Sequence, residues 1–330
     1  MSSALMLREL TKGFNTTVAV DNVSLAVEPG EFVALLGQSG SGKTTMLRLL
    51  AGFELPTSGE IVIAGSNVSG LAPSERNIGM VFQHYALFPH MSVARNIEYG
   101  LRMRGWDASR RRTRVSELLA MIKLEHVGER LPHQLSGGQQ QRVAIARALA
   151  YSPSILLMDE PLGALDRALR IEMAEEIRRI HRTLGATFIY VTHDRDEAMT
   201  LADRVLVMHQ GKIDADGKPQ QLFERPQSAF VAEFFSGMNV IAGTALGDPV
   251  ALVAVSPRTI LFTPPSEAHA SMRASVIDRL FLGEKWALLL KVEGLTEPLR
   301  AQIAAGVELP AIGPEMEVYI RQADIVKLSR

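Results

Sequence analysis

Eight residues near the start of the chain, Gly37 to Thr44, read Gly-Gln-Ser-Gly-Ser-Gly-Lys-Thr and fit the phosphate-loop pattern G-x-x-x-x-G-K-S/T. The apolar run 32–36 precedes this loop and the apolar run 46–50 follows it. This arrangement predicts a strand, a loop and a helix, in the order that the motif requires. The sequence therefore predicts an α/β fold that binds the phosphates of a nucleotide.

Each residue type in the loop has a physical reason. Glycines allow backbone N–H groups to turn towards phosphate oxygens, and the helix that follows presents the positive end of its dipole. Lys43 supplies a positive charge, and the Thr44 hydroxyl can ligate magnesium. A tight turn without a ligand is the alternative interpretation, which the fixed Lys-Thr pair disfavours. The predicted nucleotide-binding residues are Gly37, Gln38, Ser39, Gly40, Ser41, Gly42, Lys43, Thr44 and Thr45.

A second apolar run, 155–158, ends in two carboxylates, Asp159 and Glu160. In an open α/β sheet the chemistry gathers at the carboxyl ends of the strands, beside the phosphate loop. Asp159 is therefore predicted to hold magnesium, directly or through water, and Glu160 to act as general base on the attacking water. The alternative is a pair of acids that ends a strand in a solvated loop.

Residues 135–139 read Leu-Ser-Gly-Gly-Gln, and together with the phosphate loop they resemble the signature of ATP-binding cassette (ABC) ATPases. Ser136, Gly137 and Gly138 open a helix that runs through 141–149, so its free N–H groups form a second anion site, and Gln139 completes the signature. The resemblance implies a head-to-tail homodimer, in which the signature of one subunit covers the ATP held by the phosphate loop of the other. An N-capped helix with glycines for packing is the structural alternative.

Further positions match the family in order along the chain. Gln83 resembles the glutamine that reaches magnesium and the attacking water. His193, after the apolar run 187–191, resembles the switch histidine that contacts the γ-phosphate. Asp166 lies in the loop 163–166, which resembles the loop through which the two subunits sense each other, although Gly163 stands where the family usually has serine.

Phe14 resembles the aromatic residue that stacks on adenine, and Val20 is predicted to add an apolar wall to the same site. The family more often has tyrosine at this place, so the stack survives while a hydroxyl contact does not. Without the resemblance, Phe14 is a core aromatic, Gln83 a polar residue that closes a strand, and His193 a structural strand-end histidine.

Composition excludes several classes of protein. The 330 residues contain 35 Lys and Arg against 36 Asp and Glu, a formal net charge of −1, so we interpret the basic run 110–114 as solvated surface and not as a nucleic-acid contact. No apolar run approaches the ~20 residues that span a bilayer, and the start of the chain lacks the features of a secretory signal. The chain has no cysteine, which excludes disulfides and thiolate chemistry.

The predicted fold class is α/β: a P-loop ATPase core with a RecA-like sheet and an antiparallel β layer, an α-helical subdomain, and a small C-terminal all-β barrel. Runs 5–14 and 18–27 belong to the antiparallel layer, and the helical subdomain covers about 84–152. We predict an ABC cassette domain at 1–236 and a C-terminal domain at 237–330.

Apolar patterns predict a helix in the cassette domain and strands in the C-terminal domain. Leu169, Met173, Ile177, Ile180 and Leu184 recur at helical spacing and predict a helix that packs on the sheet. Beyond residue 236, alternation in 286–292 and 316–321 predicts strands with one buried face. This part resembles the oligomer-binding-type (TOBE) domain of bacterial importer ATPases. It has Ser-Pro-Arg at 256–258 where those domains commonly carry Arg-Pro-Glu, so no regulatory ligand is implied.

Together the resemblances imply the ATP-hydrolysing subunit of a bacterial ABC importer, with ATP and Mg²⁺ as cofactors. The expected partners are a second copy, two integral-membrane permease subunits and an external solute-binding protein. The loop 85–90 resembles the place that receives the coupling helix of the permease, and a local hydrophobic plug between subdomains is the alternative for this loop. The expected location is the cytoplasmic face of the inner membrane, and no nucleic acid is expected. The expected cargo is 2-aminoethylphosphonate, a polyamine or ferric iron. A soluble ABC ATPase acting on ribosomes or DNA, and an exporter motor, are the alternatives.

Overall fold

The computed structural model of the chain describes residues 3–163, 165–249 and 251–329. The chain forms two compact units that divide after Pro219. Helix α8 (Ala229–Phe234) belongs with the second unit, where Ala232 packs in one apolar cluster with Met238. The boundary between residues 236 and 237 stays a prediction of where the cassette domain ends.

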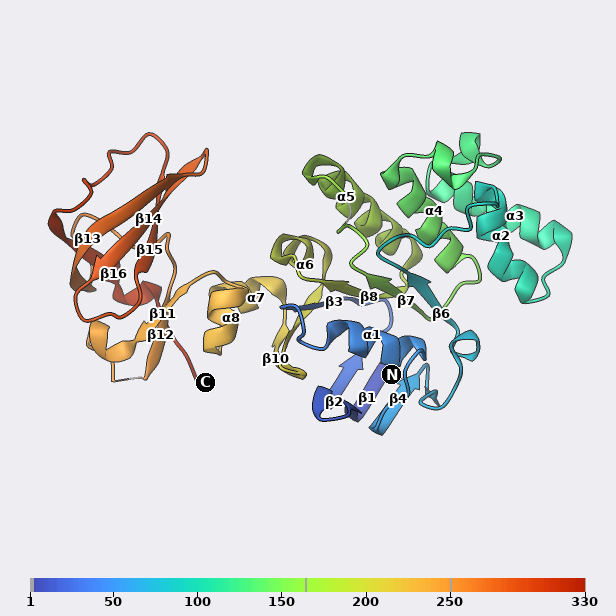
Figure 1. The fold of residues 1–330 in the computed structure, drawn as a ribbon, viewed down its shortest axis with the longest axis horizontal. Helices are drawn as coiled ribbons and strands as arrows, with labels where there is room; N and C mark the ends of the chain where they lie inside the picture. The colour runs from blue at the N-terminus through green and yellow to red at the C-terminus, as the bar shows by residue number, and fades with distance from the viewer. Residues whose placement is uncertain (1–2, 164, 250, 330) are drawn as a thin grey trace. The chain divides into compact units, whose positions relative to one another are not determined.

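A six-stranded sheet forms the centre of the first unit, with the strand order β10-β9-β3-β8-β7-β6 (Figure 1). All neighbours are parallel except β9 and β10. Strands β3 and β8 are buried along their whole length, which explains their uninterrupted apolar sequences. The strands are β3 (Phe32–Gly37), β6 (Ile78–Val81), β7 (Ile155–Asp159), β8 (Thr187–Thr192), β9 (Arg204–His209) and β10 (Lys212–Gly217).

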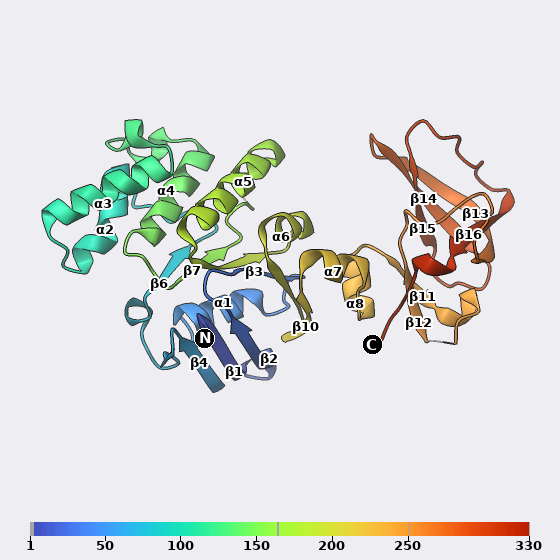
Figure 2. The same ribbon diagram turned by 180° about the vertical axis from the view of Figure 1, so that it is seen from behind.

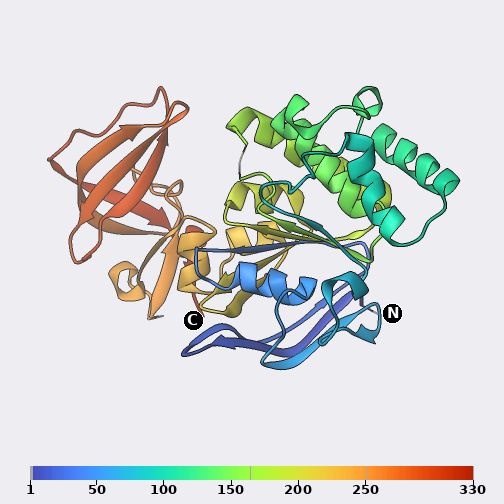
Figure 3. The same cartoon turned by 45° about the vertical axis from the view of Figure 1, so that its right-hand side comes forward.

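A second, antiparallel sheet has the order β2-β1-β4-β5, and helix α1 (Lys43–Ala51) lies between it and the central sheet (Figure 3). Residues of both sheets and of α1 form one apolar core, which includes Leu7, Val33 and Leu47. The phosphate-loop helix is therefore held on both sides by buried apolar side chains. The strands are β1 (Leu5–Phe14), β2 (Thr17–Val27), β4 (Ser58–Ile63) and β5 (Ser66–Asn67).

The helical subdomain predicted at about 84–152 contains three helices that follow one another in the chain (Figure 2). Helix α2 packs against both α3 and α4. Among the described residues, no helix combines the length and the apolar character needed to cross a membrane. The helices are α2 (Val93–Met103), α3 (Ala108–Met121) and α4 (Gly137–Leu149), with the short 3-10 helices η2 (Glu125–Val127) and η3 (Pro132–Gln134), while η1 (Pro73–Glu75) precedes β6.

Helix α5 (Arg167–Leu184) has the bounds that the apolar spacing predicts, and Met173, Ile177 and Ile180 are fully buried. Leu169 is half-buried, and Leu184, the last residue of the helix before Gly185, is exposed. Helix α6 (Arg195–Leu201) follows β8 and packs against α5.

The second unit is all-β apart from short helices, as predicted. A three-stranded sheet (β11-β12-β17) and a four-stranded sheet (β15-β14-β13-β16) share one apolar core. The alternation in the sequence is confirmed, since Leu288 and Leu290 of β14 and Val318 and Ile320 of β16 are buried. The elements are α7 (Pro219–Glu224), β11 (Asn239–Ala242), η4 (Gly243–Leu246), β12 (Leu252–Val255), β13 (His269–Phe281), β14 (Lys285–Val292), β15 (Leu299–Ala304), β16 (Glu315–Arg321), η5 (Gln322–Asp324) and β17 (Ile325–Lys327).

Arg76, only 2% exposed, connects the phosphate-loop helix to the segment that enters β6. Its Nη1 donates to the carbonyl oxygens of Leu49 (2.5 Å) and Leu50 (3.0 Å), its Nη2 to that of Ser69 (3.1 Å) and its Nε to that of Leu71 (2.9 Å). The first two are carbonyl groups at the end of α1, where the helix dipole favours a cation. Burial lowers the pKa of Arg76.

Replacement of Arg76 by methionine should lower the free energy of unfolding of the first unit by about 3 kcal/mol, because several buried carbonyl groups lose their donor. Chemical denaturation followed by tryptophan fluorescence and circular dichroism measures this loss. Arg8→Met is the matched control, since Arg8 forms only an exposed ion pair with Glu60, and should cost no more than about 0.5 kcal/mol. Equal stability of the two variants would contradict this role of Arg76.

Candidate functional site

The phosphate loop runs from the end of β3 to the start of α1, at the carboxyl end of the parallel strands. Gly42 caps α1 with φ 105°, a left-handed conformation that favours glycine. A β-carbon at Gly42 would lie 2.2 Å from the carbonyl oxygen of Ala19, and one at Gly37 would lie 2.5 Å from Ser41 Oγ. The loop therefore requires glycine for steric reasons as well as for its backbone conformation.

Lys43 is buried, and its Nζ donates to the carbonyl oxygens of Gly37 (2.8 Å) and Gln38 (2.9 Å). Burial lowers the pKa of Lys43, while the charges of Glu160 and Asp159 oppose that shift. The ammonium group thus lies inside the loop, held by backbone dipoles and facing two carboxylates.

The loop fits a nucleotide phosphate by two further observations. The buried Oγ of Ser41 has no hydrogen-bond partner among the described residues, which is rare for a buried hydroxyl. Gln38, Ser39 and Gly40 are exposed and so can approach a ligand. Thr44 is exposed at the first turn of α1, and Thr45 is half-buried beside it.

Asp159 ends β7 and Glu160 follows it in a strained backbone conformation, with φ 42°. The Glu160 backbone N–H donates to the Val191 carbonyl on the neighbouring strand (3.0 Å), which fixes the position of the strained residue. Glu160 Oε1 lies 3.1 Å from His193 Nδ1. Two residues predicted separately from the sequence are therefore brought into contact by the sheet.

The Asp159 carboxyl is held in an unfavourable environment. Burial and the neighbouring Glu160 raise its pKa, and the charges of Arg48 and Lys43 partly oppose that shift. No sequence pattern predicts this role of Arg48. Its position five residues after Lys43 on the phosphate-loop helix was the only available signal, and such a signal does not distinguish it from other helix arginines.

Strand order explains why the other predicted residues meet here. Strands β3, β8, β7 and β6 are consecutive neighbours, so the residues that follow them share one edge of the sheet. Gln83, two residues beyond β6, is exposed, and a β-carbon at Gly163 would lie 3.5 Å from its Nε2 and 3.4 Å from the Glu160 carbonyl oxygen. Asp159, Glu160, His193 and Gln83 thus gather beside the phosphate loop.

The signature residues lie on a different element. Ser136 caps α4: its Oγ accepts from the Gln139 N–H (3.3 Å), and the Gln139 Oε1 accepts from the Ser136 N–H (3.0 Å). A β-carbon at Gly138 would lie 3.0 Å from Leu169 Cδ1, so this glycine allows α4 to approach α5 closely. The structural reading of the signature, an N-capped helix with packing glycines, is therefore correct for Gly138 and Gln139. Their contact with a nucleotide stays a prediction.

Three predicted residues have local roles as well. Asp166 caps α5, where its Oδ1 accepts from the Leu169 N–H (3.0 Å). Phe14 is 43% exposed, and Lys12 Nζ lies over its ring, 4.7 Å from the ring centre, so its stacking on adenine stays a prediction. Val20 is fully buried in the core, which disfavours the predicted contact with adenine. Ala164, in the predicted interface loop, lies outside the described residues.

A parallel sheet with this phosphate loop, an acidic pair after a neighbouring strand and a helical subdomain carrying the signature defines a P-loop nucleotide-binding protein of the cassette type. Residues 20–163 match the family model described as ABC transporter. The spermidine/putrescine import ATP-binding protein PotA of Lawsonia intracellularis is 52% identical over 240 residues, and the match covers 73% of this chain and 65% of the relative.

Two further proteins extend the comparison. The sulfate/thiosulfate import ATP-binding protein CysA of Pseudomonas syringae is 43% identical, over 91% of this chain and 92% of the relative. The bacterial ABC transporter cassette MJ0796, solved as a dimer, has a TM-score of 0.58 and 36% identity, over 65% of this chain and 98% of that structure. The chain belongs to the ABC transporter family and has its α/β cassette fold.

Replacement of Gly42 by alanine should abolish nucleotide binding and lower the free energy of unfolding by about 2 kcal/mol, because the left-handed backbone and the Ala19 contact both oppose a side chain. Binding of a fluorescent ATP analogue and thermal denaturation measure the two effects. Gly70→Ala is the control, since a β-carbon there meets no atom within 4 Å. Unchanged binding by Gly42→Ala would contradict the steric account of the loop.

Asp159→Asn should raise the melting temperature of the ligand-free first unit at pH 7 by about 2–4 °C, equivalent to ~1 kcal/mol. The raised pKa of Asp159 means that its charged form costs stability in the folded state. This cost is full above the raised pKa and disappears below the unfolded-state pKa, so the gain should fade as the pH falls. The control, Glu117→Gln, alters an exposed carboxylate. A melting temperature of Asp159→Asn at or below that of the wild type would contradict the claim that the charged Asp159 carboxylate destabilises the folded state.

Proposed function

We propose that this chain hydrolyses ATP as a head-to-tail homodimer and drives an importer. The observation that carries the proposal is the convergence of Lys43, Asp159, Glu160 and His193 at one sheet edge, while Ser136 and Gly137 lie on α4. Because Ser136 and Gly137 lie on a different element from the phosphate loop, they can take part in ATP hydrolysis by completing the nucleotide site of a second copy of the chain. The cassette MJ0796, solved as a dimer, supports a dimeric assembly.

The residues then have distinct tasks. The loop N–H groups and Lys43 bind the phosphates, Phe14 stacks on the base, and Glu160 Oε1 accepts a proton from the water that attacks the γ-phosphorus. His193, 3.1 Å from that oxygen, orients the Glu160 carboxylate and contacts the γ-phosphate. The strained backbone of Glu160, with φ 42°, supports a functional role, because such strain gathers at active sites.

The donor set fits magnesium. The Thr44 hydroxyl, the Gln83 amide oxygen and the Asp159 carboxylate are the hard oxygen ligands that Mg²⁺ prefers. When bound, the ion neutralises charge on the phosphate oxygens. The raised pKa of Asp159 is consistent with a carboxylate whose charge is balanced only when a cation is present.

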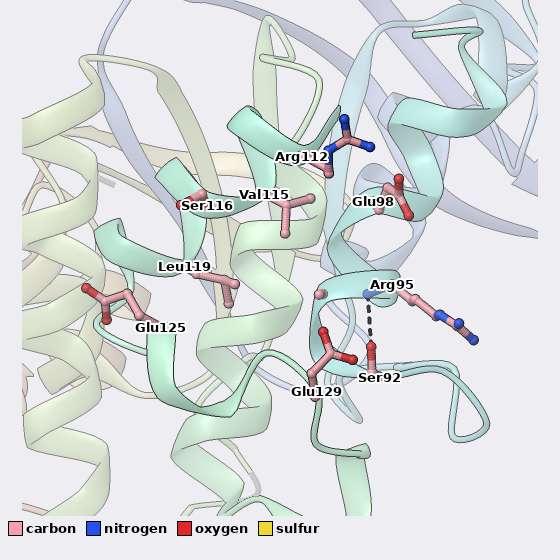
Figure 4. A pocket seen from close by; sticks show the side chains of 10 residues that line it. Ser92, Arg95, Glu98, Arg112, Val115, Ser116, Leu119, Glu125 and Glu129 are labelled. Carbon is pink, nitrogen blue, oxygen red and sulfur yellow. Dashed lines mark hydrogen bonds between the residues drawn. The ribbon is translucent and has the colours of Figure 1, made fainter. Parts of the chain in front are cut away.

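We propose that the permease binds in a groove of the helical subdomain (Figure 4). Its volume is about 390 Å³, with an apolar base and a rim of both charges, which suits a short amphipathic helix. The base includes Val115 and Leu119, and the rim includes Arg95, Arg112, Glu125 and Glu129.

The loop 85–90 is held close to the start of this subdomain. Arg147 donates to the carbonyl oxygens of Tyr85 (3.0 Å) and Ala86 (2.7 Å), and Asn96 hydrogen-bonds the backbone of Phe88 on both sides. This loop follows Gln83 directly. We propose that the permease senses the nucleotide site through this connection, at the cytoplasmic face of the inner membrane.

For cargo we propose a small charged solute delivered by an external solute-binding protein: a polyamine, ferric iron or 2-aminoethylphosphonate. PotA and CysA are named for a polyamine and for sulfate, yet both are similar to this chain, which supports selectivity by the permease and the binding protein. The C-terminal domain is proposed to be of the TOBE type.

Glu160→Gln should retain ATP binding and accumulate as an ATP-bound dimer, while turnover falls by roughly 10²-fold or more, because the amide cannot take the proton from water. Lys43→Ala should instead weaken binding itself. Steady-state ATP hydrolysis, equilibrium binding and light scattering separate the two outcomes. Normal turnover by Glu160→Gln would sink the general-base assignment.

Purification of the tagged protein from its native membranes in mild detergent should recover a polytopic permease, identified by mass spectrometry. The charge reversal Arg112→Glu with Glu125→Arg in the groove should reduce that recovery several-fold without loss of ATP turnover. Glu117→Arg, on the same helix but outside the groove, is the control. Recovery of ribosomal or DNA-processing proteins without a permease would favour a soluble ATPase.

A further inference from the structure

Arg170, in the first turn of α5, contacts three residues on two separate segments: the loop before α5 and the start of α6. Its Nη2 donates to the Leu165 carbonyl oxygen (3.2 Å), its Nη1 to Asp194 Oδ2 (3.2 Å), and its Nε lies 3.8 Å from Glu197 Oε1. Leu165 precedes Asp166 in the predicted subunit-interface loop, and Asp194 follows His193 directly. One guanidinium group thus joins that loop to the segment that carries the switch histidine.

On the histidine side, the residues flanking His193 are fixed by hydrogen bonds. The Asp194 N–H donates to Thr192 Oγ1 (3.0 Å), and Asp194 Oδ1 accepts from two N–H groups at the start of α6. Glu197, only 7% exposed, accepts from Thr192 Oγ1 (2.7 Å) and Tyr190 Oη (2.8 Å). Any displacement of Asp194 therefore moves the backbone of His193.

On the loop side, a backbone hydrogen bond connects the loop to Glu160, the proposed general base. The Gly163 N–H donates to the Glu160 carbonyl oxygen (3.1 Å), and Leu165 is buried two residues later. Since Glu160 Oε1 also contacts His193, the contacts close a ring: Glu160, the loop to Leu165, Arg170, Asp194 and His193. A movement of the loop at one side of the ring reaches the Glu160–His193 pair at the other.

Stability of α5 alone does not explain a cation at this place. A positive charge in the first helical turn opposes the helix dipole, whose N-terminal end favours anions. The contacts also require the planar, forked donors of a guanidinium group, because they reach a carbonyl oxygen in the loop and a carboxylate at the start of α6. A lysine ammonium at the same position would supply the charge without the planar fork.

We propose that Arg170 is a positioning residue that holds His193 against Glu160 and couples this pair to the loop at Leu165 and Asp166. This inference rests on the proposed function, in which that loop faces the partner subunit. Loss of the bridge should lower kcat and leave nucleotide binding intact, because the phosphate loop makes no contact with Arg170 among the described hydrogen bonds and ion pairs.

The test compares the full-length chain with Arg170→Gln, Arg170→Lys and Asp194→Asn. The first should lower kcat by roughly 10- to 100-fold with KM within about twofold of wild type, the scale of a misplaced catalytic group. Lysine should fail to restore kcat. Asp194→Asn keeps a capping oxygen but loses the charge, and its effect should be non-additive with Arg170→Gln. Arg182→Gln, an exposed arginine of the same helix, is the control.

Three outcomes would overturn the proposal: wild-type kcat in Arg170→Lys, full additivity with Asp194→Asn, or a rise in KM and a fall in melting temperature that account for the loss. A second readout is independent of turnover. The imidazole NMR signal of His193 should shift in Arg170→Gln and not in Arg182→Gln, and an unshifted signal would refute the bridge. Absence of ATP turnover in the wild type, with the NMR shift present, would instead refute the proposed function.

Discussion

The site depends on a buried ammonium group facing two carboxylates. Lys43 is buried inside the glycine-rich loop, and the charges of Glu160 and Asp159 raise its pKa against the effect of burial. These groups can be held together because β3 and β7 flank β8 in one parallel sheet, whose carboxyl ends share an edge. The apolar core on both sides of α1 fixes the helix that carries Lys43. The electrostatics of the site are thus set by the packing of the sheet.

The same packing separates the two elements that we predict to bind phosphate. The phosphate loop belongs to the sheet edge, whereas the Ser136 cap belongs to α4 in the helical subdomain. Gly138 lets α4 lie against α5, and α5 begins at the loop that contains Leu165 and Asp166. The signature helix and the interface loop are therefore packed on each other, next to the Arg170 bridge. This continuity gives the proposed subunit interface a physical connection to Glu160.

The helices, strands and the phosphate loop were largely predictable from the sequence, because their local patterns agree with their packing in the fold. The bounds of α5 follow from apolar spacing, and the phosphate loop from its glycines and Lys43. Contacts between distant segments were not predictable in the same way. Nothing in the sequence pairs Glu160 with His193, places Arg76 on the carbonyl groups of α1, or makes Arg170 donate to both Leu165 and Asp194. The burial of Val20 likewise follows from how the two sheets pack.

The central claim is that one nucleotide site is built from two copies of the chain. The most direct measurement mixes the Lys43→Ala chain with a Gly137→Asp chain and compares the ATP turnover of the mixture with that of each variant alone. Each homodimer has two defective sites, whereas the mixed dimer has one intact site, formed by the phosphate loop of one chain and the signature of the other. The account predicts that mixing restores turnover. Turnover no greater than the sum of the separate variants, with both folded and associated, would contradict it.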